Sequence, residues 1–105
     1  MNRSHYEIRK LAAKHKPPES GKQSIVLLDD AKTKVVLFAF AAGVGLTEHV
    51  APFPAIMEII TGEAALTVGN EPVAGKPGTW IRMAAGILHS IKAESPVVML
   101  LTLLK

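Results

Sequence analysis

The chain contains no cysteine, which excludes disulfides, thiolate nucleophiles and cysteine-ligated zinc or iron–sulfur centres. Aromatic residues make up only 5% of it, so we expect a core built mainly from aliphatic side chains. No apolar run could cross a bilayer, because the longest spans residues 35–46 and a membrane-spanning helix needs about 20 residues. No apolar stretch follows the basic N-terminus, so we expect no secretory signal and a cytoplasmic location.

Positive charge is concentrated at one end of the chain. The 105 residues carry a net charge of +3. Residues 1–34 hold eight Lys or Arg against four acidic residues, whereas residues 35–105 hold four against five. Nucleic-acid-binding surfaces interleave basic and aromatic residues, and the basic segment offers only Tyr6. We therefore expect a solvated basic tail, with neither nucleic acid nor a membrane as partner.

After the basic segment, short apolar runs alternate with turn signals at intervals of about 8–12 residues, which is typical of an all-β domain. Because Pro17 and Pro18 end the first segment, we expect an N-terminal arm over residues 1–22 and a β-barrel over residues 23–105. The runs are 24–28, 34–40, 46–50, 55–61, 64–68, 79–83, 87–93 and 97–104. Strands this short and numerous close up as a barrel or a double-sheet jelly roll.

Two of these runs, residues 35–40 and 97–104, are apolar on both faces instead of alternating. A small barrel buries one face of each strand and leaves the other to water, so these strands need a second cover. We expect that cover to be another copy of the chain, in a homodimer where sheet packs on sheet. The alternative is that the arm folds over this face, and both hold if the arms are exchanged between subunits.

Two histidines, His49 and His89, lie inside the β region, whereas His5 and His15 lie in the arm. The segment from Gly43 to Gly62 resembles the first cupin motif, G-x5-H-x-H-x3,4-E-x6-G. The segment from Gly78 to Ala93 resembles the second, G-x5-P-x-G-x2-H-x3-N. The glycines and the two histidines fall in register, and the short spacer between the motifs is like that of small single-domain cupins. The resemblance implies a cupin-type double-stranded β-helix, or RmlC-like jelly-roll barrel, with a short N-terminal arm.

The chain departs from the cupin pattern at the metal ligands. Cupins hold a divalent metal with three histidines and one glutamate, but the second histidine falls on Ala51 and the glutamate on Ala55. Only His49 and His89 remain as metal ligands, so the resemblance implies at most a degenerate site for iron, manganese, zinc or nickel. The nearest carboxylates, Glu48 and Glu58, have the wrong strand parity and would reach the site only through a bulge.

The same two histidines are candidates for anchoring a small ligand in an apolar barrel. Strand alternation places Thr47 and Ala51 on the side of His49, and Met57 on the side of Ala55. We expect nine residues to line this space: His49, His89, Ala51, Phe53, Ala55, Met57, Trp80, Met83 and Met99. Phe53, between Pro52 and Pro54, is either a lid over the pocket or a rigid turn. No catalytic residue is identified.

The sequence leaves three functions open. The first is the binding of a small apolar or weakly acidic molecule inside the barrel, anchored by His49 and His89, without catalysis by the protein itself. The second, implied by the resemblance, is a metal-dependent enzyme of the dioxygenase, isomerase or decarboxylase type that uses the same pair. The third is a sensory or stress module whose partner is another protein, with the arm as the contact.

Overall fold

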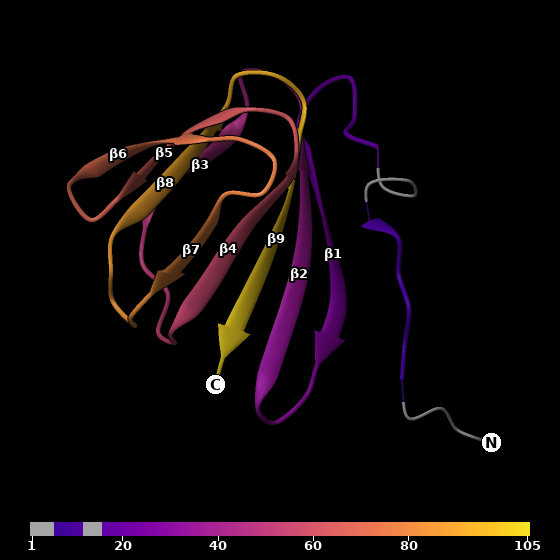
Figure 1. The fold of residues 1–105 in the computed structure, drawn as a ribbon, viewed down its shortest axis with the longest axis vertical. Helices are drawn as coiled ribbons and strands as arrows, with labels where there is room; N and C mark the ends of the chain where they lie inside the picture. The colour runs from indigo at the N-terminus through magenta and orange to yellow at the C-terminus, as the bar shows by residue number, and fades with distance from the viewer. Residues whose placement is uncertain (1–5, 12–15) are drawn as a thin grey trace.

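The computed structural model describes residues 6–11 and 16–105, which form two antiparallel sheets packed face to face (Figure 1). The larger sheet has the strand order β1-β2-β9-β4-β7, and the smaller has the order β3-β8-β5-β6. The strands are β1 (Lys22–Asp29), β2 (Thr33–Phe40), β3 (Gly45–His49), β4 (Ala55–Thr61), β5 (Ala64–Val68), β6 (Glu71–Gly75), β7 (Trp80–Met83), β8 (His89–Ala93) and β9 (Val97–Leu104). The predicted all-β jelly roll is confirmed.

One strand, β6, was not predicted from the sequence. It contains Pro72, which has no N–H to give to a ladder, and the sequence around it has the character of a turn. The strand exists because β6 is the edge strand of its sheet and pairs only with β5, where Thr67 lies opposite Pro72. An edge strand pairs on one side only. A proline whose nitrogen faces the unpaired side therefore removes no hydrogen bond from the ladder.

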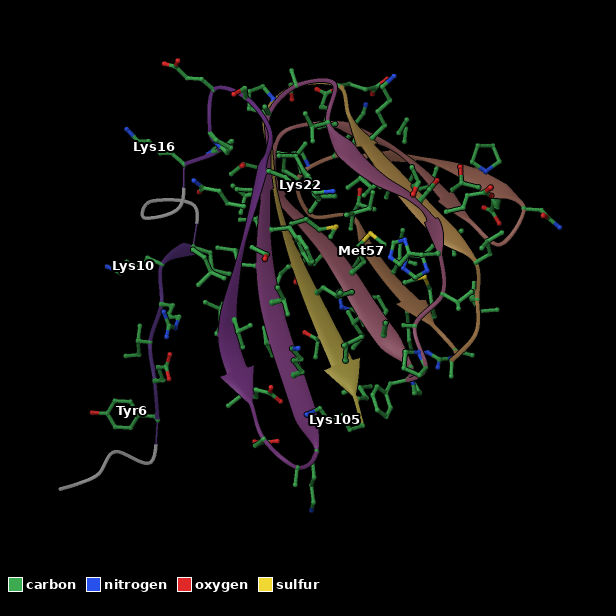
Figure 2. The ribbon with its side chains drawn as sticks, turned by 180° about the vertical axis from the view of Figure 1, so that it is seen from behind. Tyr6, Lys10, Lys16, Lys22, Met57 and Lys105 are labelled. Atoms are coloured by element: carbon green, nitrogen blue, oxygen red, sulfur yellow. The ribbon has the colours of Figure 1, made fainter. Side chains whose placement is uncertain are left out.

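The register of the larger sheet shows which residues share a face. Met57 pairs with Leu101 and with Ile81 across two ladders, and all three belong to or pack against the hydrophobic core between the sheets. Figure 2 shows Met57 in this interior. Alternate residues therefore form the outer face of the sheet. In β2 and β9 the outer face is apolar as well, since Leu37 and Val98 lie there and are each 1% exposed.

Within the N-terminal segment, residues 6–11 lie beside β1 (Figure 1). β1 begins at Lys22, one residue before the expected start of the barrel. Parts of the predicted arm, residues 1–5 and 12–15 with His5 and His15, lie outside the described residues. The described part of the chain contains no helix of the length and hydropathy needed to cross a membrane.

Candidate functional site: a pair of histidines

The two histidines of the β region meet across one ladder. His49 ends β3, His89 begins β8, and the two residues are direct partners in the pairing of these strands. Their ring centroids are 4.2 Å apart, with the ring planes inclined at 58°. The strand pairing thus brings together two side chains that lie 40 positions apart in the sequence.

Each imidazole is held by a hydrogen bond to its own backbone. Nδ1 of His49 lies 2.7 Å from the carbonyl oxygen of Thr47, and Nδ1 of His89 lies 2.9 Å from that of Ile87. A carbonyl oxygen only accepts, so both Nδ1 atoms donate. In each neutral ring the proton is therefore on Nδ1, and Nε2 keeps its lone pair. The pair presents two fixed hydrogen-bond acceptors or metal-ligating nitrogens.

The two rings differ in their exposure to solvent. His89 is only 5% exposed and is the one buried polar residue of the described part of the chain, whereas His49 is exposed. The site thus has an inner and an outer imidazole, and a molecule arriving from solvent meets His49 first.

A bulge in β3 determines which neighbours join the site. Leu46 pairs with Ile91 and His49 pairs with His89, so three steps along β3 match two along β8. Strict alternation is broken at Thr47 and Glu48. Both residues line a second cavity of about 570 Å³ together with the outward-facing Ser90, although Thr47 also borders the depression beside His49. The bulge therefore does not bring the Glu48 carboxylate to the histidine pair.

The side chain of Lys22 lies beside His49, a neighbour that the sequence did not indicate. A depression of about 260 Å³ is lined by Lys22, Gly45, Leu46, Thr47 and His49. Lys22 pairs with the core residue Phe40, so it lies on the inner face at the end of β1. Its Nζ donates to the carbonyl oxygen of Gly45 at 3.4 Å. The contact joins β1 of the larger sheet to β3 of the smaller sheet, and no local sequence pattern reveals it.

Gly45 is required by this packing. A Cβ at residue 45 would lie 1.9 Å from the carbonyl oxygen of Ile91, closer than any side chain tolerates. The absence of a side chain lets β3 lie close to β8. The loops next to the histidines are also tied together, since the Gly86 N–H donates to the Ala51 carbonyl oxygen at 2.9 Å.

The remaining residues expected to line the ligand space divide into three groups. Ala55, Met57, Met83 and Met99 are 1–3% exposed and belong to the hydrophobic core. Ala51 and Phe53 are half-buried in the loop between β3 and β4. The placement of Trp80 on the barrel wall is a correction: it pairs with Glu58 on the outer face and is 57% exposed. The methionines are therefore part of the core between the sheets, and Trp80 does not contribute to this space.

The residues present do not fit the four-ligand metal centre of the cupins. Within residues 6–11 and 16–105, no three His, Cys, Asp or Glu side chains gather as a metal-binding group. Glu48 lines the other cavity, and Glu58 is on the outer face beside Leu100 and Trp80. Two imidazoles are fewer ligands than the three or four that protein zinc sites use.

No family model and no curated protein matches the sequence. Solved structures do match the fold over nearly the whole chain. A conserved protein of unknown function from Streptococcus pyogenes is 26% identical, with 100% of this chain and 92% of that chain covered and a TM-score of 0.85. A cupin superfamily protein from Desulfitobacterium hafniense is 23% identical, with coverages of 99% and 95% and a TM-score of 0.85.

A third structure is that of a cupin 2 conserved barrel domain protein from Leptotrichia buccalis. It is 29% identical, with a TM-score of 0.83, and the match covers 90% of this chain but only 46% of that one. These likenesses confirm the resemblance seen in the sequence motifs. The chain has the cupin fold and is a small cupin barrel whose motif histidines, His49 and His89, lie in contact as a pair.

Proposed function

We propose that this small cupin barrel binds a small, weakly acidic molecule at the His49–His89 pair and performs no metal-dependent chemistry there. The observation that carries the proposal is the hydrogen bond between Nδ1 of each ring and a backbone carbonyl oxygen. Because both Nδ1 atoms donate to backbone carbonyls, the two Nε2 atoms accept hydrogen bonds, and an O–H group is their natural partner.

The surroundings of the pair favour a ligand with an acidic head and an apolar body. Lys22 lies beside His49 in the same depression, and its ammonium group stabilises negative charge that develops on a bound acid. Leu46 provides an apolar wall there. A few convergent polar groups beside an apolar surface are characteristic of small-molecule sites.

Phenol and toluene test the proposal as a matched pair, since they share a ring and differ in the O–H donor. The assay is scanning calorimetry of the whole chain in the presence of a chelator. A ligand at 100 times its Kd stabilises the folded state by about 2.7 kcal/mol, so phenol should raise the Tm of the wild type more than toluene does. In His49→Phe, which keeps a ring and removes the acceptor, the excess should disappear. An equal response of wild type and variant would contradict the proposal.

The second candidate is a metal-dependent enzyme of the dioxygenase, isomerase or decarboxylase type that uses the same two histidines. One observation favours it, because metal-ligating histidines in proteins also donate their second ring nitrogen to a fixed acceptor. Equilibrium dialysis against iron, manganese, zinc and nickel, followed by elemental analysis, separates the candidates. Near-stoichiometric metal that His49→Ala loses would favour the enzyme. The ligand-binding proposal expects wild type and variant to retain equally little.

A further inference from the structure

The second cavity, of about 570 Å³, lies on the outer face of the smaller sheet, on the side away from the hydrophobic core. Its walls come from β3, β8 and β5, which are neighbours in that sheet (Figure 1). Leu46, Ile91 and Leu66 pair in one row across these strands and pack in or against the core. Residues one step from Ile91 and Leu66 therefore point to the outer face, where the cavity is open.

The hollow exists because the residues on both sides of Lys92 are small. Lys92 pairs with Gly45 of β3 and with Ala65 of β5, and all three line the cavity. A glycine and an alanine leave the space beside the long lysine side chain unfilled. The resulting volume lies within the range of about 300–1,000 Å³ that is usual for small-molecule sites.

Two hydroxyl groups stand next to this hollow. Ser90 precedes Lys92 by two residues on β8 and pairs with Thr67 of β5, and both Ser90 and Thr67 are half-buried and line the cavity. In the part of the chain that the structure describes, neither hydroxyl group has a hydrogen-bond partner in the protein. Each can donate one hydrogen bond to a ligand and accept others from it.

Two opposite charges border the same cavity. Glu48 lies in the β3 bulge opposite Ser90, and Lys92 lies two residues further along β8, which is about 7 Å along a strand. Both charged residues are exposed and line the cavity, and the ion pairs found within the described residues are elsewhere. The cavity therefore has a negative end, where the hydroxyl groups also lie, and a positive end.

We propose that this cavity binds a free α-amino acid, with the ammonium group of the ligand at Glu48 and its carboxylate at Lys92. A ligand with a single charge would be attracted at one end of the cavity and repelled at the other, whereas a zwitterion is attracted at both ends. An ammonium group has three N–H donors, and the Glu48 carboxylate and the hydroxyl oxygens of Ser90 and Thr67 are three acceptors for them.

The two charges of the cavity also limit the side chain of the ligand. Glu48 and Lys92 are the charged residues among those that line it, and both are engaged by the charges on the ligand's own backbone. A third charge on the ligand would find no partner, so a neutral side chain is favoured. This site is separate from the function proposed for the histidine pair, because neither His49 nor His89 lines it.

Leucine and two of its analogues test the two charges separately. Isocaproate is leucine without its ammonium group, and isoamylamine is leucine without its carboxylate group. The assay is titration of the isotope-labelled full chain, followed by the backbone amide signals in two-dimensional NMR spectra. We expect leucine to shift the signals of Ser90 and Lys92 saturably, and each analogue to bind at least tenfold more weakly than leucine.

Lys92→Gln and Glu48→Gln each remove one charge at an exposed position, and the NMR spectrum itself reports whether the fold is retained. Both variants should bind leucine at least tenfold more weakly. Lys92→Gln should bind isoamylamine no more weakly than the wild type does, and Glu48→Gln should bind isocaproate no more weakly, because each substitution removes a repulsion. Lys76→Gln is the matched control: Lys76 is exposed between β6 and β7, away from the cavity, and its loss should change the leucine affinity less than twofold.

A wild-type spectrum without saturable shifts at 20 mM leucine would overturn the proposal. So would an affinity for leucine no higher than the affinity for either analogue, because recognition would then depend on one charge or on the alkyl group alone. Equal leucine affinities of Lys92→Gln and Lys76→Gln would place the binding elsewhere on the chain and would overturn it as well.

Discussion

Removing His89 should destabilise the fold far more than removing His49, although the two rings make the same local hydrogen bond. His89 is 5% exposed and packs between His49 and Val68 on the neighbouring strands. His89→Ala removes a hydrogen bond to the Ile87 carbonyl oxygen, which contributes about 1 kcal/mol. It also leaves a cavity of roughly 60 Å³, which costs about 1.5 kcal/mol at 24 cal/mol per Å³.

His49→Ala should cost below about 1 kcal/mol, because water replaces the exposed ring and solvates the Thr47 carbonyl oxygen. For a domain of this size, 1 kcal/mol corresponds to about 4–8 °C in Tm. We therefore expect a decrease of about 10–20 °C for His89→Ala and a few degrees for His49→Ala, measured by calorimetry with urea midpoints as a check. Equal decreases, or a Tm of His89→Ala within about 3 °C of the wild type, would refute the assignment of an inner and an outer ring.

Two further predictions concern the frame of the barrel and its pH dependence. Gly62 has φ +86° and a Cβ there would lie 2.0 Å from the Pro96 carbonyl oxygen, whereas Gly43 has φ +83° and open space around it. Gly62→Ala should therefore lower the unfolding free energy by about 2 kcal/mol or more, and Gly43→Ala by about 1 kcal/mol. Equal losses of unfolding free energy would show that the positive φ alone, and not the contact with Pro96, sets the cost of the substitution. The hydrogen bond from Lys105 Nζ to Asp29 (2.6 Å) lowers the pKa of that carboxyl below its ordinary value of 3.8. The stabilisation by this hydrogen bond is present above pH 3.8 and is lost as the pH falls through the lowered pKa of Asp29. The urea midpoints of wild type and Asp29→Asn should therefore differ slightly at pH 7 and converge near pH 2. A difference in midpoint that persists at pH 2 would contradict this linkage.

Much of the strand pattern could be predicted because the turns are marked in the sequence. Strands β4, β5 and β9 begin and end at the predicted residues. Pro54 and Gly62 flank β4, Gly69 follows β5, and Pro96 precedes β9. β6 escaped prediction because Pro72 counts against a strand in any local reading. Only its position at the sheet edge, a property of the whole fold, makes the proline acceptable.

The candidate site could be predicted in its residues but not in its chemistry. The motif spacing brings His49 and His89 together, and the structure places them in contact. Their tautomers depend on hydrogen bonds to Thr47 and Ile87, and these follow from local backbone geometry that residue types do not determine. Lys22 reaches Gly45 across 23 positions, which only the register of the assembled sheets brings about.

The alanine at position 55 shows why the site has two imidazoles and no carboxylate. Ala55 is 1% exposed and pairs with Met83 and Leu103. A carboxylate at this position would be a buried charge, which a protein tolerates only when a cation or several hydrogen bonds compensate it. The methyl group needs no compensation and packs in the hydrophobic core with Met57, Met83 and Met99. In the function that we propose, polar recognition is therefore confined to the depression where His49 and Lys22 lie, and the acidic group of a ligand would meet these residues before the buried ring of His89.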